Sequence, residues 1–478
     1  MTKSMSRRSF LMKASVLMGL TAASGALAAC GATPAPAATP TAAAKPTTAP
    51  AVAATPTSAA AQPTAAATVA PAATQPAAAS GQQVTLTMWK GPHKAAGDET
   101  KLCAGPTLEK FMAANPNIKV DFQEIPWNGY NEKFTSAFAA GQPPDVSYQT
   151  ESFPTFVKAG NILPLDDLMA QSNFDKKYIL DRAWGLAQTN GVTYAMPWIE
   201  GGSFMLYNKD LFKKAGLDPE TPPDTMDDFL SYAKKITALG NDTYGYAVNP
   251  KEWHENGQWN IRWGGRWFND DLTQCVADSK EAMGGWQFLS DLFNKDKVAL
   301  PAAVAEQEPG AWGYFRDGKV GMITAQSPQV NSLRQEKPDF PLGGCFVPKG
   351  PAPEPAGRAA YGGVGMLAIA KATKHVQESW TLLNWLVTPD ALKSWIGCLG
   401  FSCAAANVFL FEGDPIISIA EKGRQFHFFW PYTDWIFKFW DLEATYIEAI
   451  LLGQRTVDEG IKELVSKVND LLKASATG

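Results

Sequence analysis

Histidine is scarce in this chain, with four among 478 residues. None of the four has a second His four positions away or a nearby Cys partner, the spacings that protein metal sites use. The chain also lacks a Gly-x-Ser-x-Gly elbow and a Gly-rich phosphate loop ending in Lys. Gly362-Gly363-Val364-Gly365 is too short to indicate a dinucleotide site. We therefore predict no metal, no cofactor and no catalytic residue.

Long apolar runs and basic runs are also missing from most of the chain. After residue 30 no stretch approaches the roughly 20 apolar residues that a membrane-spanning helix needs. Residues 1–82 hold five of the 42 Lys and Arg and none of the 47 acidic residues, so the remainder has 37 basic and 47 acidic residues, a net charge of about −10. No basic run interleaves with aromatic residues, which argues against a nucleic-acid partner.

The first 29 residues have the pattern of an export signal. Ser6-Arg7-Arg8-Ser9-Phe10-Leu11 is followed by an apolar run from Ala14 and then by Leu27-Ala28-Ala29-Cys30. A basic region, a hydrophobic region and small residues before a cleavage site indicate a signal peptide. The arginine pair resembles a twin-arginine signal, although it also fits the basic region of a general secretory signal. Leu27-Ala28-Ala29-Cys30 resembles a bacterial lipobox, in which Cys30 carries the lipid.

The segment 30–82 lacks large apolar side chains and consists almost entirely of Ala, Pro and Thr. Such a composition buries too little surface to offset chain entropy, so we expect a disordered linker. Its recurring prolines disfavour a continuous helix. The sequence therefore predicts a lipid-anchored protein whose folded body begins near residue 83 and lies outside the cytoplasm, at the cell surface or in the periplasm.

Five cysteines remain in the body, so at least one is unpaired within the chain. Cys398 and Cys403 bracket Leu-Gly-Phe-Ser and would close a small loop if they formed a disulfide. The spacing leaves that pairing open. The other three are expected to be small core residues.

Strand and helix patterns alternate along the body, which predicts an α/β fold. Expected strands lie at 84–89, 118–122 and 145–148, and expected helices at 107–114 and 130–140. Asn190-Gly191 predicts a hairpin turn. Thr225 to Asp228 and Thr456 to Glu459 are expected to cap two later helices, the second at the C-terminus.

Several short motifs occur in a fixed order over residues 83–478. They are Asn115-Pro116-Asn117, Gln142-Pro143-Pro144-Asp145-Val146, Leu163-Pro164-Leu165, Tyr194-Ala195-Met196-Pro197, Leu206-Tyr207-Asn208-Lys209-Asp210, Phe315-Arg316-Asp317-Gly318 and Gly362-Gly363-Val364-Gly365. In order and spacing the set resembles extracellular solute-binding proteins of the maltose-binding type, which serve carbohydrate ABC importers, in their lipoprotein form. Met226 departs from the resemblance, because the family usually has Trp there.

The resemblance implies a periplasmic-binding-protein-like α/β fold with two lobes, a hinge and an interlobe ligand cleft. It implies lobe 1 at 83–199 plus 327–373 and lobe 2 at 200–326 plus 374–478, with crossings near Trp198–Gly201, near Ala325-Gln326 and after about Ala370. The implied function is capture of a carbohydrate, a di- or oligosaccharide, by hinge closure and its delivery to the transmembrane subunits of the importer. A monomer is expected.

Recognition of a sugar needs flat aromatic side chains that stack on the ring and polar groups that bind its hydroxyls. The resemblance directs attention to strand ends and loops. The candidate ligand-binding residues there are Trp89, Trp127, Tyr130, Tyr148, Glu151, Trp198, Glu200, Trp253, Glu255, Trp259, Trp263, Trp312, Gln326, Gly363, Trp430, Tyr432 and Trp435. Five other tryptophans have helical spacing with apolar neighbours and are expected in the core: Trp184, Trp286, Trp380, Trp385 and Trp440.

Two other functions remain open at this stage. A secreted carbohydrate-active hydrolase would use two of the many carboxylates, and a structural surface lipoprotein would bind no solute. Within the resembling family, glycerol phosphates, polyamines and iron are alternative solutes. The sequence offers neither a convincing phosphate-binding cluster nor the paired tyrosines of iron binders.

Overall fold

A computed structural model describes residues 83–94, 97–251, 257–305 and 310–476. The chain divides into two units, Met1–Ala67 and Thr68–Gly478, and every described residue belongs to the second. The export signal, Cys30 and the linker therefore lie outside the described residues, as do Trp253 and Glu255. No helix in the described part of the chain is long and apolar enough to cross a membrane.

The body begins with parallel strands separated by helices, as the alternating pattern predicts. Strand β1 (Val84–Lys90) pairs with β2 (Ile118–Glu124) along its whole length and with β3 (Val146–Gln149) at its end. Leu86 and Met88 of β1 are fully buried. The connecting helices are α2 (Gly105–Ala114) and α3 (Tyr130–Ala139), so the first five predicted elements are confirmed to within a few residues at their ends.

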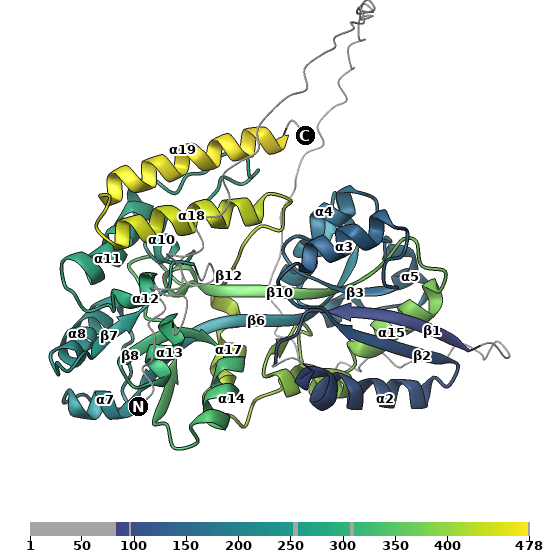
Figure 1. Cartoon of the computed structure of the whole chain (residues 1–478), viewed down its shortest axis with the longest axis horizontal. Coiled ribbons are helices and arrows are strands. Elements are labelled where there is room, and N and C mark those ends of the chain that lie inside the picture. The colour runs from purple at the N-terminus through teal and green to yellow at the C-terminus, as the bar shows by residue number, and fades with distance from the viewer. Residues whose placement is uncertain (1–82, 95–96, 252–256, 306–309, 477–478) are drawn as a thin grey trace, which may run out of the picture. The chain divides into compact units, whose positions relative to one another are not determined.

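Two long buried strands join the first part of the sheet to the second. All 14 residues of β6 (Ala195–Asn208) are buried. Its first part, through Gly202, pairs with β10 (Ala360–Ile369), and its second part pairs with β8 (Val320–Gln326) and β9 (Leu342–Cys345). The sheet order is β2-β1-β3-β10-β6-β8-β7, where β7 is Tyr244–Ala247. Figure 1 shows β6 and β10 side by side between the two groups of strands.

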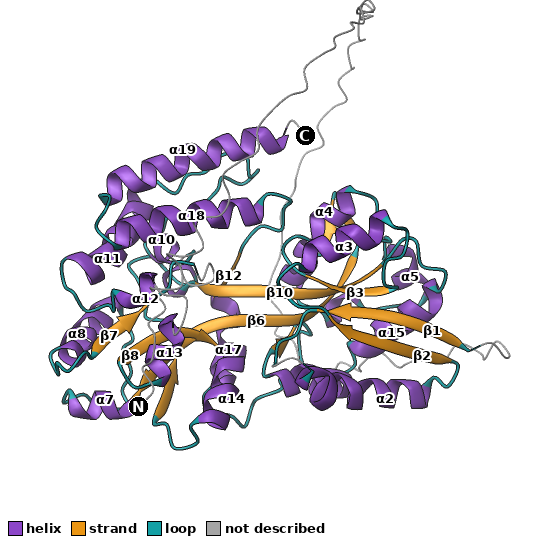
Figure 2. Cartoon of the chain, viewed as in Figure 1, coloured by secondary structure: helices purple, strands orange, loops and turns teal. Residues whose placement is uncertain are grey.

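Helices lie on both sides of the strands (Figure 2), which makes the fold mixed α/β as expected. The remaining elements are η1 (Thr100–Ala104), α4 (Phe153–Lys158), α5 (Asp166–Gln171), η2 (Lys176–Tyr178), α6 (Asp181–Leu186), β4 (Gln188–Thr189), β5 (Val192–Thr193), α7 (Lys209–Lys214), α8 (Met226–Thr237), α10 (Trp259–Arg262), α11 (Lys280–Asn294), α12 (Ala302–Ala305), α13 (Gly310–Arg316), α14 (Ser327–Glu336), η3 (Ala356–Arg358), α15 (Val376–Leu386), α16 (Pro389–Leu392), η4 (Lys393–Gly397), β11 (Ser402–Cys403), α17 (Ile417–Lys422), η5 (Gly423–Phe426), β12 (His427–Phe429), α18 (Ile436–Leu451) and α19 (Val457–Ala476).

Local signals in the sequence match the structure closely. Asn190 and Gly191 have φ of 53° and 77° and join β4 to β5, which is the backbone that a tight hairpin turn needs. Thr225 and Asp228 form the predicted capping box of α8. Thr456 and Glu459 form a second one at the start of α19.

The buried apolar side chains form three clusters. The first cluster joins residues of 86–199 with residues of 364–405. The second cluster joins residues of 205–361 with residues of 430–472. The third joins residues of 204–333 with Ile417 and Ala420. The expected lobe boundaries differ from these clusters at two segments. Val330 and Leu333, expected in lobe 1, pack in the third cluster, and Trp380 and Trp395, expected in lobe 2, pack in the first.

The reason for that difference is the strand pairing. Gln326, where a return to lobe 1 was expected, pairs with Ser203 of β6, and the chain then forms β9 on the same part of β6. The chain rejoins the first cluster only through β10, whose Val364 to Ile369 pack there.

A disulfide joins Cys103 to Cys398, across 295 residues of sequence. The pairing of Cys398 with Cys403 considered from the sequence is therefore wrong. Cys403 instead lies buried in β11, paired with Ile199 of β6, and is a free thiol together with Cys275 and Cys345. The helices η1 and η4 come into contact in the fold and bring the two bonded cysteines together.

Candidate ligand-binding site

Glycines lie where the paired strands β6 and β10 pass from one group of strands to the other. Gly201 pairs with Gly363 and Gly202 with Gly362. A Cβ atom added at Gly363 would collide with the hydroxyl of Tyr361, and one added at Gly365 would collide with that of Tyr148. These glycines therefore allow tyrosine side chains to lie directly against the strands.

A buried carboxylate lies among these tyrosines. Glu151 is 7% exposed, and the hydroxyl of Tyr361 donates a hydrogen bond to its Oε1 at 3.3 Å. Burial raises the pKa of Glu151 above its ordinary value. Burial and then the charge of Glu151 also raise the pKa values of Tyr148, Tyr361 and Tyr432. Glu151 is thus an acceptor surrounded by hydroxyl groups.

Aromatic rings continue this surface. Trp127 is 43% exposed, and its indole N–H donates to the carbonyl of Pro92 at 2.7 Å, which fixes the ring. The Trp127 ring lies 4.9 Å from the Tyr130 ring and 6.2 Å from the Tyr148 ring, centroid to centroid. The His93 ring lies 5.3 Å from Trp127 and 5.0 Å from Phe401.

The second group of strands contributes a polar group to the same face. A Cβ atom at Gly201 would lie 3.2 Å from the Phe401 ring and 3.3 Å from Oε1 of Gln326, the last residue of β8. We call this set the crossing site. It consists of His93, Trp127, Tyr148, Glu151, Gln326, Tyr361, Gly363 and Phe401.

The opposite face of the crossing strands carries a separate ionic cluster. Glu200 is fully buried and accepts hydrogen bonds from Arg182 at 2.7 Å and from His427 at 3.0 Å. Burial opposes its charge, but the bonds from His427 and Arg182 outweigh burial and lower the pKa of Glu200. Because side chains alternate along a strand, Glu200 faces away from Gly201 and the crossing site.

Several aromatic candidates lie in the hydrophobic core. Trp198 is 1% exposed, its indole N–H donates to Leu386, and its ring lies 5.0 Å from Trp395. Three others are buried in the second cluster: Trp259, Trp430 and Trp435. Trp89 packs against Phe134, and Trp263 against Phe288. Trp312 stacks on Phe315.

Two further candidates support the crossing site from behind. Tyr130 donates its hydroxyl to the carbonyl of Tyr148 at 2.8 Å. The Tyr432 hydroxyl donates to the carbonyl of Val364 and accepts from its N–H, at 2.6 and 2.9 Å. It therefore satisfies backbone groups of β10 between the segments paired with β12 and β3.

The tryptophans predicted for the core are found there. Four are at most 6% exposed: Trp184, Trp286, Trp380 and Trp440. Trp385 is partly buried against Phe111.

Three members of the crossing site were not predicted: His93, Tyr361 and Phe401. Tyr361 directly precedes the Gly362-Gly363 motif, and that position was its available signal. His93 follows the first strand by three residues, at a strand end like the other candidates, and that position was its available signal. Phe401 lies beside Gly201 only because the fold returns residues 376–405 to the first cluster.

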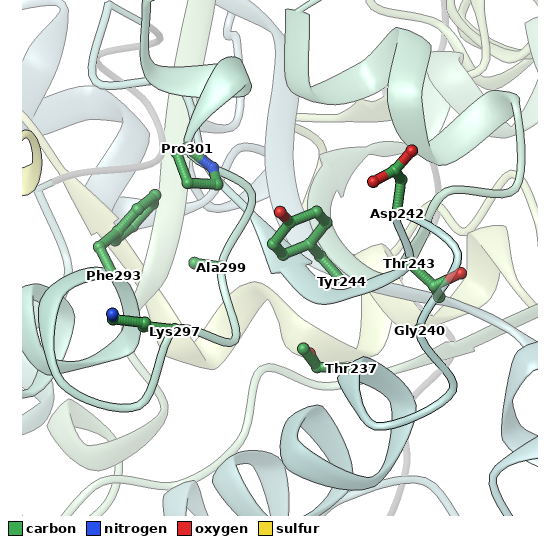
Figure 3. Close-up of a pocket in the computed structure, with 9 residues that line it drawn as sticks. All are labelled: Thr237, Gly240, Asp242, Thr243, Tyr244, Phe293, Lys297, Ala299 and Pro301. Carbon is green, nitrogen blue, oxygen red and sulfur yellow. The ribbon is translucent and has the colours of Figure 1, made fainter.

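A surface pocket lies elsewhere in the body, with a volume of about 430 Å³. Figure 3 shows its lining residues, which come from the end of α8, the turn that follows it, the start of β7, the end of α11 and the segment after α11. None of the predicted ligand-binding residues lines it.

Comparisons with known proteins agree on one family. Residues 96–393 match the family model of bacterial extracellular solute-binding proteins. A putative binding protein of Brucella abortus (strain 2308) is 26% identical over 386 residues, 77% of this chain and 90% of that protein. The sn-glycerol-3-phosphate-binding periplasmic protein UgpB of Escherichia coli O6:K15:H31 (strain 536) is 26% identical over 376 residues, 72% of this chain and 81% of that protein.

Among solved structures, the ABC transporter solute-binding protein of Thermotoga lettingae TMO, bound with α-D-tagatose, is similar to this chain with a TM-score of 0.69. It is 26% identical, and the match covers 81% of this chain and 99% of that one.

Proposed function

Because the chain belongs to the bacterial extracellular solute-binding proteins, we propose that it captures a carbohydrate for an ABC importer at the crossing site. The observation that carries the proposal is the combination of a fixed, exposed indole at Trp127 with a buried acceptor at Glu151 and surrounding hydroxyl groups. The similar Thermotoga lettingae protein is bound with a sugar.

The chemistry of a sugar fits these groups. A pyranose or furanose ring presents an apolar C–H face that stacks on an indole, and a belt of hydroxyls that both donate and accept hydrogen bonds. Glu151 and Gln326 supply acceptors, and the tyrosines supply donors and acceptors. We propose a ligand of two or more rings, as expected from the resemblance to the maltose-binding type, with one ring stacked on the exposed indole of Trp127.

Hinge closure is the motion that we propose. Trp127 and Glu151 lie in the part of the chain, 86–199, that packs in the first cluster. Gln326 is the last residue of β8, a strand that packs in the third cluster. A ligand that contacts both groups would hold them together, and β6 and β10 would bend at their glycines. The proposed lobes are 84–202 with 363–405, and 203–361 with 417–472, which replaces the boundaries expected from the sequence. The closed form would be the one that the transmembrane subunits recognise.

Two alternatives make different chemical demands. A glycerol phosphate, the solute named for the Escherichia coli relative, is an anion and is best bound by cationic side chains, whereas the acidic side chain of the crossing site, Glu151, would repel it when ionised. A hydrolase needs two carboxyl groups about 5 or 9 Å apart, whereas the crossing site has one. We therefore favour a neutral, hydroxyl-rich solute and binding without hydrolysis.

A thermal-shift screen tests the substrate class. The purified body is heated with mono-, di- and oligosaccharides, glycerol 3-phosphate and a polyamine, and the true ligand raises Tm because it binds only the folded state. A rise with glycerol 3-phosphate alone would replace the carbohydrate proposal. Release of reducing sugar from the bound ligand would favour the hydrolase.

Calorimetry then tests the site. Trp127→Ala should weaken sugar binding about thirtyfold or more, since loss of a stacking hot spot costs about 2 kcal/mol or more. Phe437→Ala, at an aromatic residue of similar exposure on α18, is the matched control and should bind normally. Equal affinity of the Trp127 variant and the parent would move the site elsewhere.

Anchorage is a separate proposal that rests on Leu27-Ala28-Ala29-Cys30. Cys30→Ala should release the protein from the membrane fraction into the soluble fraction, with sugar binding unchanged. Retention of the variant on membranes would argue against a lipid on Cys30. Whether export uses the twin-arginine route is tested by Arg7→Lys with Arg8→Lys, which keeps the charge but removes the guanidinium groups.

A further inference from the structure

Lys90 lies at the end of β1 with its ammonium group fully buried. Its Nζ has three hydrogen-bond partners: Oε1 of Glu99 at 2.6 Å, Nδ1 of His93 at 2.7 Å and the carbonyl of Gly91 at 2.9 Å. An ammonium group has three N–H bonds and no acceptor. Each of the three contacts therefore takes one proton of Lys90.

The surroundings of Glu99 show that this ion pair is charged. Glu99 is fully buried, and its other two contacts are also donors, the indole N–H of Trp395 and the backbone N–H of His93, both at 2.8 Å. A protonated carboxyl would have to donate, and a buried carboxylate needs a cation. Lys90 is that cation.

The tautomer of His93 follows from this arrangement. Because Lys90 can only donate, Nδ1 of His93 must accept, and the ring proton of the neutral imidazole must be on Nε2. Among the described residues Nε2 has no hydrogen-bond partner, and the side chain is 17% exposed. The ring lies against Trp127, Tyr148 and Phe401, at 5.3, 5.6 and 5.0 Å. A donor of fixed direction thus faces the crossing site.

Protonation of His93 is also disfavoured. Burial, and then the positive charge of Lys90, lower the pKa of His93 well below its ordinary value of 6.5. The titratable groups around the ring are Lys90, Glu99, whose Oε2 is 4.0 Å from Nδ1, and Tyr148. Of these, Lys90 is the nearest, and its positive charge favours the neutral imidazole.

We propose that the Lys90–Glu99 pair holds His93 as a neutral Nε2–H donor to an oxygen atom of the bound solute. The contact between His93 and a solute rests on the proposed function. The tautomer of His93 concerns the ligand-free protein and does not depend on that function. Lys90 and Glu99 are positioning residues, and His93 is the residue that touches the solute. This arrangement selects solutes that present a hydroxyl or ether oxygen at that point.

Nitrogen NMR of the ligand-free body tests the tautomer directly. With ¹⁵N-labelled histidine, His93 should show one protonated and one unprotonated ring nitrogen, with Nε2 protonated and both signals constant from pH 5 to 8. His375, at the start of α15 and outside this network, provides the reference signal. A protonated Nδ1, or signals of His93 that move with pH over this range, would overturn the proposal whether or not any sugar binds.

A double variant, Lys90→Met with Glu99→Gln, removes both charges together, so no buried charge is left unpaired. Its circular dichroism should match the parent, while the two nitrogen signals of His93 should move toward an average of the two tautomers. An unchanged pair of signals in this variant would show that Lys90 does not set the tautomer. Lys133→Met, at a lysine over the Trp89 ring, is the matched control and should leave the signals in place.

Binding measurements use maltotriose as the probe, or the best sugar from the screen if maltotriose gives no Tm shift. His93→Phe should lose about tenfold or more in affinity, and His93→Gln, which keeps an N–H donor near Nε2, should recover most of it. If the His93→Phe variant binds the sugar as tightly as the parent, His93 does not contact the solute. If no sugar binds the parent, the proposed function is refuted instead.

Discussion

At the scale of single residues, the buried carboxyl group of Glu443 costs folding free energy. It lies on α18, fully buried, and neither carboxyl oxygen has a hydrogen-bond partner among the described residues. Burial raises its pKa well above the ordinary value of 4.5. The unfolded chain therefore releases this proton at a lower pH than the folded chain, and stability from this group falls as pH rises above 4.5.

We expect Glu443→Met to raise the free energy of unfolding at pH 7 by about 1–3 kcal/mol. The substitution removes a buried polar group that has no hydrogen-bond partner among the described residues and replaces it with an apolar side chain of similar size. The gain should shrink as the pH is lowered toward 4.5, where the unfolded carboxyl also keeps its proton. Urea unfolding at pH 7 and pH 5 measures both effects. Glu448 lies on the same helix, is partly exposed and pairs with Lys251, so Glu448→Met should bring no such gain.

At the scale of elements, the C-terminal helix depends on its first turn. In α19, the Thr456 hydroxyl accepts from the N–H of Glu459, and the Glu459 carboxylate accepts from the N–H of Thr456, both at 3.2 Å. Ile461, Leu464 and Val468 then pack into the second cluster. A helix N-terminus without such a cap leaves buried or exposed N–H groups unpaired.

Thr456→Ala should therefore reduce the free energy of unfolding by about 1 kcal/mol, the usual loss for a capping residue. Thr445→Ala is the control, since Thr445 is an exposed threonine in the middle of α18 whose hydroxyl donates to the carbonyl of Asp441. Thermal unfolding of both variants would measure the difference. A Thr456 variant as stable as the parent would mean that packing against α18 and α11 is enough to hold the helix.

At the scale of the whole molecule, the disulfide between Cys103 and Cys398 restricts the unfolded chain most. It closes a loop of 295 residues, and both ends lie in segments that pack in the first cluster. Cys103→Ser with Cys398→Ser should lower stability by about 2–5 kcal/mol, because the unfolded chain regains that freedom. Reductant should lower the Tm of the parent but not of the double variant. Equal stability of both proteins in oxidising buffer would show that the bridge contributes nothing.

The same bridge ties the region of the crossing site together. Cys103 follows Glu99 by four residues, and Cys398 follows Trp395 by three, and Glu99 accepts a hydrogen bond from Trp395. The buried Lys90–Glu99 pair, the disulfide and the His93 ring are therefore one connected region. It lies in the part of the body that provides Trp127 and Glu151.

The sequence by itself determined the features whose causes lie within a few residues. The Asn190-Gly191 turn, the caps at Thr225 and Thr456 and the strand–helix alternation from Val84 to Gln149 rest on local backbone preferences and periodic burial. The ordered motifs likewise identified the family, because each is a short local segment. These predictions needed no knowledge of which distant residues meet.

Only the tertiary structure decided the features that depend on distant contacts. Trp127 and Trp198 are equally plausible in sequence, yet one is exposed and the other is buried against Trp395, about 200 residues away. The partner of Cys398 and the cluster that residues 376–405 join were likewise set by packing across the chain. Burial is a property of the assembled core, so residue type alone does not separate a stacking tryptophan from a structural one.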